Sequence, residues 1–560
     1  MNKKNKSLDI FYCPLGGAGQ IGMNLYLYGY GNIKHEINWI MIDCGIGFVD
    51  EHYPGIDIMV PNLDFFNNPR NKLIGVILTH AHEDHYGAVA TLINGQFNVP
   101  VYCTKFTSEL IKEKIYDDYG DLDLDLQVVK DNAKFKIKEF SIELINVAHS
   151  IPEPNSIEIS INGFNILHSG DWKIDDQPVI NRKTDIKKFK RFGKSGCDVL
   201  VCDSTNIFRK KVSLSEKEVS INLKNVIKGN AGLVIVTTFS SNVSRLKSII
   251  EAAKSNKRQV ILSGRSIKRF VKIAKSCGYL NKDDVFFEEK DLKKISKNKT
   301  LIICTGSQGE KNASLTKIAN GMNSLVNLDY GDLVVYSSKT IPGNENSVGY
   351  IKNKIIELGA SVIDDVMEDV HTTGHPSRIE VELLYNLLQP NILIPMHGEL
   401  YHLAEHIRFA KDHNINKPIL VKNGEILKLS PYLPSIIEKS DVKFFLRDGD
   451  LFIEPEDNSL KERRRIQDSG ILFISLNLDK NYILYTDPVI DIAGVPDIND
   501  NNLNTKDIIE SKIDEIIDSL PKSKKRDNEY LKKYIEKAVT NDLYSKWGKK
   551  TMCRVNITFV

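Results

Sequence analysis

Four side chains that can bind metal ions lie close together near residue 80. The stretch VILTHAHEDHYGAVATLI, residues 76–93, contains the pattern His-x-His-x-Asp-His, formed by His80, His82, Asp84 and His85. A lone histidine is usually structural, but the full pattern arises by chance in only about one such chain in a thousand. Neutral imidazoles bind borderline cations such as Zn²⁺, and a carboxylate beside them can serve a second ion. The pattern therefore predicts two metal ions, and such a pair can activate water for attack.

The residues around this pattern predict elements that would hold it in place. The apolar run 75–78 predicts a short buried strand, and the small residues of 87–93 predict a helix. A strand, a loop and a helix in this order fix the backbone, so several ligands can point to one position.

Short apolar runs alternate with helical patterns over most of the chain, which indicates an α/β protein. The predicted strands include NWIMIDCG, FSIELINVAH, FNILHSGD, CDVLVCDST, GLVIVTTF and PNILIPMHG. Many of them end in Gly, Ser, Thr, Asp or His, so we expect the chemistry to lie in loops at strand ends. Three residues at such ends could supply the further ligands that two ions need: His149, Asp171 and His397. Each of them alone would more often be structural.

The carboxy-terminal part has a different pattern. Residues 440–468 are rich in charge and predict a connector, and GILFISLNLDKNYILYTDP after it predicts a hairpin of two strands. Two amphipathic helices, TKDIIESKIDEIIDSL and NEYLKKYIEKAVTNDLYSKW, and a closing strand, CRVNITFV, follow. With 560 residues the chain is long enough for two to four domains.

The charge of the chain is unevenly distributed. The formal net charge is only +2, but residues 181–300 hold 29 Lys and Arg against 11 Asp and Glu. Solvated surface lysines are the ordinary explanation of such an excess. Because this region also contains aliphatic runs such as AGLVIVTTF, it belongs to a folded segment, and a polyanionic partner becomes plausible.

The composition also indicates in which cellular compartment the protein is expected. The lysines of the amino terminus are not followed by an apolar run, and no stretch approaches the length of about eighteen apolar residues that a membrane span needs. The eight cysteines include no CxxC pair, which argues against a disulfide framework and against a thiolate zinc site. We therefore expect a cytoplasmic protein with no membrane partner.

The order of the His and Asp residues resembles the metallo-β-lactamase superfamily, whose His-x-His-x-Asp-His loop is followed by a His, a bridging Asp and a final His. The resemblance implies that one zinc ion is bound by three histidines, the second by one aspartate and two histidines, and that a further aspartate bridges the two. In this chain the sets are His80, His82 and His149, then Asp84, His85 and His397, with Asp171 as the bridge. Asp84 would also orient the attacking hydroxide.

Three later motifs narrow the resemblance. DSTN at residues 203–206, TTGH ending at His375 and PMHGE around His397 resemble motifs A, B and C of the β-CASP group of nucleases, in which a histidine at motif C goes with RNA substrates. Stretches such as LGGAGQIGMN, IDCGIGFVDEHYPGID, FSSNVSR, ICTGSQGE, IPGNE and HTTGHPS are similar to the ribonuclease J family over nearly the whole chain. The similarity is loosest in the carboxy-terminal part.

The resemblance implies a fold and a domain order. The fold would be α/β, a metallo-β-lactamase αββα sandwich with an inserted β-CASP α/β domain and a small α+β carboxy-terminal domain. The sandwich would comprise residues 1–212 and 369–445, with the inserted domain at 213–368. A linker at 446–468 would lead to the carboxy-terminal domain at 469–560.

The resemblance also assigns residues to the reaction. His375 would be the general acid and Asp203 would orient it, although by residue type alone Asp203 is a turn-capping aspartate. The loop formed by His371, Thr372, Thr373, Gly374 and His375 would contact the RNA backbone. Ser240, Ser241 and Asn242 would bind the terminal 5′ phosphate, and a plain serine-rich turn is the alternative.

The function implied is that of a zinc-dependent ribonuclease, a 5′-to-3′ exonuclease on 5′-monophosphorylated RNA that also cuts internally, in RNA maturation and mRNA decay. Mn²⁺ could replace Zn²⁺ in activity. The implied partners are single-stranded RNA, a second copy or three further copies of the chain, and other members of an RNA-decay complex. Two alternatives stay open: a small-molecule hydrolase of the same superfamily, which would not need the basic insertion, and a catalytically weak RNA-binding scaffold, which a missing ligand would favour.

Overall fold

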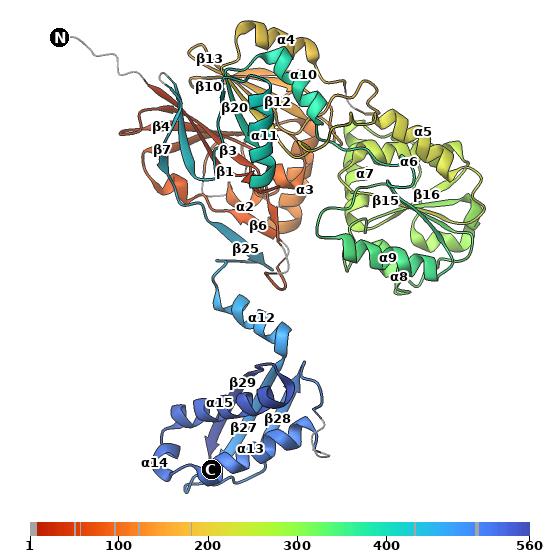
Figure 1. Ribbon diagram of the computed structural model, residues 1–560. Coiled ribbons are helices and arrows are strands. Elements are labelled where there is room, and N and C mark those ends of the chain that lie inside the picture. Colours follow the sequence, from red (N-terminus) through yellow and green to blue (C-terminus); the bar gives the residue numbers. More distant parts are fainter. Residues whose placement is uncertain are drawn as a thin grey trace, which may run out of the picture. The chain divides into compact units, whose positions relative to one another are not determined.

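The computed structural model describes residues 8–49, 52–56, 58–93, 97–120, 124–180, 182–430, 433–498 and 503–560 (Figure 1). The amino-terminal lysines and residues 50, 51 and 57 of the IDCG motif lie outside these ranges. The chain forms two compact units, residues 1–47 with 60–443 and residues 48–59 with 444–560. Within the described ranges, no helix combines the length and the apolar character needed to cross a membrane.

Two sheets form the centre of the first unit. In spatial order, the first consists of β24 (Ser435–Lys439), β23 (Glu425–Ser430), β1 (Asp9–Gly16), β3 (Leu25–Gly31), β4 (Ile37–Ile42), β7 (Asn71–Ile77), β8 (Val101–Cys103) and β9 (Leu126–Val128). The second consists of β10 (Lys134–Ile137), β11 (Phe140–Asn146), β12 (Asn155–Ile161), β13 (Phe164–His168), β14 (Val199–Asp203), β20 (Ile392–Met396) and β22 (Lys417–Pro418).

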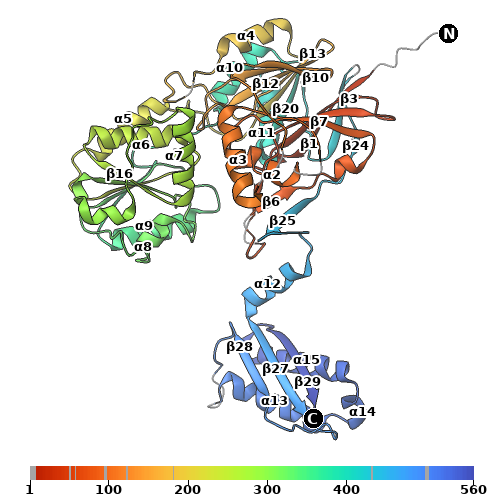
Figure 2. The ribbon, with the colours of Figure 1, turned by 180° about the vertical axis from the view of Figure 1, so that it is seen from behind.

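The two sheets pack face to face through alternate residues of their strands. One buried cluster contains Tyr28 and Ile40 of the first sheet together with Ile157 and Ile394 of the second. Helices α4 (Ile186–Ser195), α10 (Arg378–Leu388) and α11 (Leu400–Asp412) contribute Phe189, Leu384 and Phe409 to a second cluster on the outer face of the second sheet. Together with α3 (Lys105–Tyr119), they give the predicted αββα sandwich (Figure 2).

The inserted domain lies between two strands that are neighbours in space. β14 and β20 are parallel partners, with Asp203 opposite Met396, and the chain between them contains a separate five-stranded sheet. All its pairs are parallel, and its order is β16 (Gln259–Ser263), β17 (Thr300–Cys304), β15 (Val234–Thr237), β18 (Leu333–Tyr336) and β19 (Ser361–Ile363).

Helices cover both faces of this inserted sheet. α8 (Ser314–Ala319) and α9 (Glu345–Glu357) pack on one face through Leu315 and Ile351. On the opposite side of the sheet in Figures 1 and 2 lie α5 (Glu216–Ile227), α6 (Val243–Ser255) and α7 (Arg265–Cys277).

A buried arginine of the inserted domain, held by an ion pair within that domain, also contacts the segment that returns to the sandwich. Arg245 of α6 is fully buried, and its Nε lies 2.7 Å from Oε1 of Glu216. Its Nη1 also donates to the carbonyl oxygens of Ser337, at 2.8 Å, and Val370, at 3.0 Å. Removing one partner of such a pair typically costs about 3–5 kcal/mol, because the other charge is left buried and uncompensated. The chain just before His371 is therefore strongly fixed.

The second unit has its own core. β28 (Val489–Ala493), β27 (Ile471–Leu478) and β29 (Met552–Phe559) form a three-stranded sheet, and α13 (Thr505–Ser519) and α15 (Asn528–Trp547) cover one face of it. Leu472 and Ile474 of β27 pack against Ile513 and Ile535 of these helices. The predicted helices and closing strand are therefore present.

Three local predictions differ from the structure. The second strand of the hairpin was expected within residues 482–488, but only one isolated bridge, between Leu478 and Leu484, forms there, and the pairing strand begins at Val489. The expected helix 87–93 is only a single turn, α2 (Val89–Leu92), and another single turn, α1 (Glu83–Tyr86), precedes it within the metal-ligand pattern. The segment expected as a linker, 446–468, contains the end of β25 (Phe444–Asp448), β26 (Leu451–Ile453) and most of α12 (Asn458–Ser469).

Candidate metal centre

All seven predicted metal ligands meet at one end of the sandwich. They follow the ends of four strands: β7, β11, β13 and β20. Their ligand atoms form two groups, each within 4.8 Å, namely His80, His82, His149 and Asp171, and Asp84, His85 and His397. A third set within the same distance joins Asp171 and His397 to Asp203 and His375. The short loops at the ends of these strands thus gather side chains that are far apart in the sequence.

The first group consists of three imidazoles whose nitrogens face one another. His82 Nδ1 lies 2.9 Å from His80 Nε2 and 3.1 Å from His149 Nε2. Burial lowers the pKa of His82 to about 4 and the pKa of His80 and of His149 well below the usual value. Neutral imidazoles with converging lone pairs are the form that binds a borderline cation, so this group fits a metal site.

The second group combines two imidazoles with a carboxylate. Asp84 Oδ2 lies 3.5 Å from His85 Nε2 and 3.4 Å from His397 Nε2, and His397 Nε2 is buried without a hydrogen-bond partner. Burial opposes a charge on His397, but the carboxylates of Asp171, Asp84 and Asp203 raise its pKa to about 10. The surroundings therefore favour a positive charge at this position, which a cation would supply.

Asp171 lies between the two groups. Its Oδ2 is 3.7 Å from His80 Nε2 and 3.3 Å from His85 Nε2, so one carboxylate oxygen faces both sets. Its Oδ1 accepts a hydrogen bond from His397 Nδ1 at 2.9 Å. This is the position that the sequence assigned to a bridging aspartate.

Asp43 supports the centre and was missed by the sequence interpretation. This fully buried carboxylate accepts a hydrogen bond from His85 Nδ1 at 2.7 Å and from the backbone N–H of Thr79 at 2.8 Å. A carboxylate behind a ligand imidazole fixes the orientation of the ring and makes it a better ligand. The signal was the aspartate that ends the strand in NWIMIDCG, which composition alone does not distinguish from a turn residue.

Asn24, from the LGGAGQIGMN stretch, is a second residue missed by the sequence interpretation. Its buried Nδ2 lies 3.2 Å from Asp84 Oδ2 and 3.0 Å from His85 Nε2. The hydroxyl of Tyr26 donates to Asn24 Oδ1 at 2.7 Å, which fixes the orientation of the amide. Asn24 thereby positions the second ligand group.

His375 and Asp203 form a hydrogen-bonded pair beside the ligands. His375 Nδ1 lies 2.7 Å from Asp203 Oδ2, and His375 Nε2 lies 3.8 Å from Asp171 Oδ2. The pKa of His375 is raised overall. Burial opposes the protonated form, but the charges of Asp203 and Asp171 and the hydrogen bond to Asp203 outweigh it. The imidazole thus has one nitrogen held by Asp203 and the other directed toward the ligand cluster.

Close packing and hydrogen bonds fix the loop from His371 to His375. The carbonyl oxygen of Gly374 accepts from His149 Nδ1 at 2.6 Å, and a Cβ at this glycine would come within 2.4 Å of the His149 ring. Thr372 donates its hydroxyl to the carbonyl oxygen of Leu214.

The other residues of this loop are also held by polar contacts. His371 Nδ1 lies 3.3 Å from Nη1 of the buried Arg245. Asn206 donates to Thr373 Oγ1 at 2.8 Å and to the carbonyl oxygen of His375 at 3.1 Å. Much of the polar capacity predicted for RNA therefore holds the loop itself.

The predicted phosphate-binding residues lie after β15 in the inserted domain. Ser240 Oγ is 2.8 Å from Ser266 Oγ, and Ser241 is half-buried. Asn242 is buried and caps α6, because its Oδ1 accepts from the backbone N–H of Arg245 at 2.9 Å. The hydroxyls of Ser240 and Ser241, rather than the Asn242 carbonyl, are thus the groups that could meet a ligand.

Among the residues that the structure describes, no cysteine belongs to the groups of candidate metal ligands. All eight cysteines are free, and seven of them are buried. Cys44 and Cys202 adjoin Asp43 and Asp203 in the sequence, and burial raises the pKa of both thiols well above the usual value. The ligands are therefore nitrogen and oxygen throughout.

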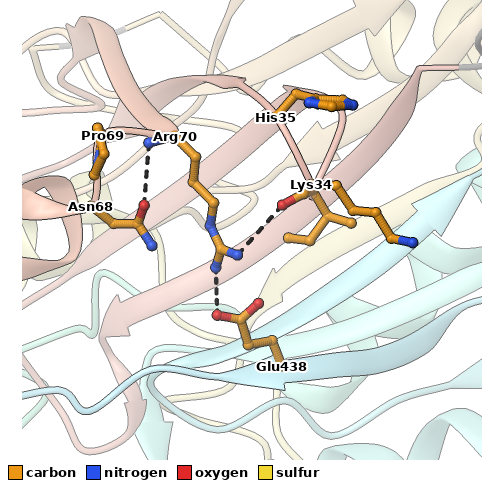
Figure 3. A pocket seen from close by; sticks show the side chains of 7 residues that line it. Lys34, His35, Asn68, Pro69, Arg70 and Glu438 are labelled. Carbon is orange, nitrogen blue, oxygen red and sulfur yellow. Dashed lines mark hydrogen bonds and ion pairs between the residues drawn. The ribbon is translucent and has the colours of Figure 1, made fainter.

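A surface pocket at the edge of the first sheet is unrelated to this centre. It is lined by Lys34, His35, Asn68, Arg70 and Glu438, among others, and the Arg70 guanidinium pairs with the Glu438 carboxylate (Figure 3). None of its lining residues is a predicted site residue.

Comparison with known proteins identifies the family. Residues 38–209 match the model of the beta-lactamase superfamily domain, residues 231–355 that of the ribonuclease J beta-CASP domain, and residues 458–560 that of the ribonuclease J C-terminal domain. The chain is 38% identical to Ribonuclease J of Sinorhizobium meliloti over 552 residues, which covers 99% of this chain and 98% of that protein. The chain belongs to the ribonuclease J family. As a member of this β-CASP group of metallo-β-lactamase nucleases, it is a hydrolase.

Another relative and a solved structure are also similar to the chain. Ribonuclease J2 of Bacillus subtilis is 30% identical over 86% of this chain and 86% of its own length. A crystal structure of a protein of unknown function from Enterococcus faecalis V583 has a TM-score of 0.51 at 14% identity, over 75% of this chain and 100% of that chain, and it shows a similarity of fold alone.

The support that Asp43 gives to His85 can be tested by metal binding. Asp43→Ala should weaken Zn²⁺ binding by roughly 10- to 100-fold, because His85 loses the carboxylate that orients it. Competition with a chelator of known affinity measures the loss. Asp198→Ala is the matched control, since Asp198 precedes β14 and its carboxylate accepts only from the backbone N–H of Asn165 among the described contacts. Unchanged affinity in Asp43→Ala would contradict the assignment.

Proposed function

We propose that this chain is a two-zinc ribonuclease that degrades 5′-monophosphorylated RNA from its 5′ end and also cuts RNA internally, in RNA maturation and mRNA decay. The observation that carries the proposal is one buried cluster that contains all seven metal ligands and the His375–Asp203 pair. Relatives named Ribonuclease J support RNA as the substrate.

The donor set fits two cations. His80, His82 and His149 would hold one and Asp84, His85 and His397 the other, with Asp171 shared between them. When bound, two such ions lower the pKa of water and neutralise charge on the phosphoryl oxygens. Nitrogen and carboxylate ligands suit Zn²⁺, and Mn²⁺ could replace it in activity.

His375 is the proposed general acid. Its Nδ1 is held by Asp203 at 2.7 Å, so the proton to be transferred lies on Nε2, which faces the cluster. The negative charge of Asp203 keeps the imidazole protonated until the leaving oxygen takes the proton. If each cycle regenerates a 5′ monophosphate, that leaving oxygen is the 3′ oxygen of the nucleotide released.

The inserted domain, proposed at residues 213–368, would grip the RNA. The excess of 29 basic over 11 acidic residues between positions 181 and 300 supports a sequence-independent attraction to phosphates. The Ser240 and Ser241 hydroxyls at the end of β15 would bind the terminal phosphate. The backbone around Thr373 and Gly374 would approach the phosphate next to the scissile bond.

The end-group preference is the central test. RNA that carries a 5′ monophosphate should be degraded to mononucleotides much faster than the same RNA with a 5′ triphosphate, because a hydroxyl-lined pocket admits the smaller and less charged group. The release of label from 5′-labelled and 3′-labelled RNA with each end group measures this preference and the internal cuts. Ser240→Ala should erase the preference and spare internal cuts, whereas Ser276→Ala at the end of α7 should change neither.

His82→Ala supplies the control for contaminating nuclease in the same assay, since it should lose stoichiometric metal and all cleavage while its circular dichroism stays unchanged. Full activity of His82→Ala, or hydrolysis of a lactam or thioester in place of RNA, would refute the proposed function.

The general acid can be tested with a better leaving group. His375→Ala should slow cleavage of ordinary RNA by roughly 10²- to 10⁴-fold. RNA with sulfur in place of the scissile 3′ oxygen should be cleaved by this variant nearly as fast as by the parent, because a thiolate leaves without a proton. His371→Ala, in the same loop, should slow both substrates equally. An equal loss on both substrates in His375→Ala would contradict the role.

We also propose that the carboxy-terminal module joins copies of the chain into a dimer or tetramer and offers a surface to other proteins of RNA decay. Phe473 and Val489 are exposed on the sheet face opposite to α13 and α15, being 49% and 59% exposed. Deletion of residues 470–560, or Phe473→Glu, should lower the mass measured by light scattering and weaken cleavage. Tyr534→Glu on α15 is the control, and an unchanged mass in both test variants would contradict the proposal.

A further inference from the structure

An exposed stack of aromatic rings lies among the catalytic loops and has no part in the reaction described above. The rings of Phe208 and Tyr401 are stacked, with centroids 4.5 Å apart and planes inclined by 20°. The ring of His402 meets both rings edge-on, with centroids 5.5 Å from Phe208 and 6.1 Å from Tyr401. Tyr401 is 69% exposed and Phe208 38% exposed, so the outer ring of the stack is open to solvent. We call Phe208 and Tyr401 the aromatic platform.

The strand register places the aromatic platform on the two chain segments that follow β14 and β20. Asp203 at the end of β14 pairs with Met396 at the end of β20, and each platform ring lies five residues beyond one of these two partners. The two connecting loops are joined, since Thr205 Oγ1 donates to the carbonyl oxygen of His397 at 3.0 Å. The platform therefore extends from the loops that carry motif A and motif C.

The backbone that carries the rings is rigid. Arg378 donates from Nε to the carbonyl of Ile207 at 3.0 Å and from its backbone N–H to the carbonyl of Arg209 at 2.9 Å, one contact on each side of Phe208. Tyr401 lies in the first turn of α11. Two large rings held open to water at fixed positions cost hydrophobic free energy unless a ligand covers them.

Cations follow the platform in the sequence. Arg209, Lys210 and Lys211 come directly after Phe208, and Lys210 and Lys211 are exposed. None of the three forms an ion pair with any carboxylate in the described part of the chain; Arg209 Nε donates to the carbonyl of Lys211. Open aromatic faces next to unneutralised cations are the combination that binds single-stranded nucleic acid, because the rings stack on bases and the cations attract phosphates.

We propose that a nucleobase of single-stranded RNA stacks on the aromatic platform while Lys210 and Lys211 contact the neighbouring phosphates. This inference rests on the proposed function and adds a contact with a base to the phosphate contacts already proposed. Stacking makes the contact tolerant of sequence, since every base has an aromatic face.

The test uses the full chain and a single-stranded RNA with a non-cleavable 2′-O-methyl backbone, in which 2-aminopurine replaces one base at a time. Fluorescence of 2-aminopurine falls when the base stacks, so one position should be quenched on binding. Tyr401→Leu and Phe208→Leu should abolish the quenching and weaken binding by roughly 5- to 100-fold, the loss expected for one base stack. Tyr330→Leu, at a 93% exposed tyrosine of the inserted domain, should change neither.

Salt dependence tests the cations separately. The double variant Lys210→Ala, Lys211→Ala should reduce the slope of log affinity against log salt by roughly 1 to 1.5, as expected when two phosphate contacts on a single strand are lost. Quenching should persist in this variant at low salt.

The outcomes separate this inference from the proposed function. If the parent cleaves ordinary RNA but both leucine variants keep the parent's affinity and quenching, the platform is wrong and the proposed function stands. If Tyr401→Leu changes the mass by light scattering and leaves RNA binding intact, the rings form a protein contact and the inference is overturned. If the parent neither binds nor cleaves RNA, both fail.

Discussion

The need to balance buried negative charge dominates this structure. Asp43, Asp171 and Asp203 are buried at one end of the sandwich, where an unpaired carboxylate would be very costly. Imidazoles surround them, but the imidazoles that burial keeps neutral cannot supply the charge. His397 and His375, whose pKa the carboxylates raise, balance part of this charge, and cations bound to the donors at the strand ends would supply the rest. The centre and the fold around it are therefore one electrostatic unit, and the loops have little freedom to vary in position.

The insertion between β14 and β20 respects this constraint. Because β14 and β20 are neighbours, the chain can form a whole domain between them while Asp203 stays close to His397. The returning segment is fixed by Arg245 before it reaches His375, which lies 172 residues after the Asp203 that it contacts. The insertion thus leaves the contact between His375 and Asp203 intact.

The sequence predicted the positions of residues that belong to a compact motif or that directly follow a predicted strand. The resemblance placed the seven proposed ligands in one site and His375 beside Asp203, and the structure brings these residues together, because each motif has a fixed order along the chain. The role of Asp43 was not, because a lone aspartate after a strand has no distinguishing neighbour. The capping by Asn242 and the stack of Phe208 on Tyr401 arise from tertiary contacts between residues whose own surroundings say nothing of each other. The second hairpin strand was misplaced because YILY has the composition of a strand but is not paired as one.

A centre built from nitrogen and oxygen donors has a consequence for oxidative stress. Hydrogen peroxide attacks thiolates, and a metal site that depends on them loses its ion when they are oxidised. Here no cysteine is a ligand, and Cys44 and Cys202, which adjoin Asp43 and Asp203, are buried thiols that stay protonated. Oxidation of a cysteine would therefore remove no ligand from the proposed metal centre.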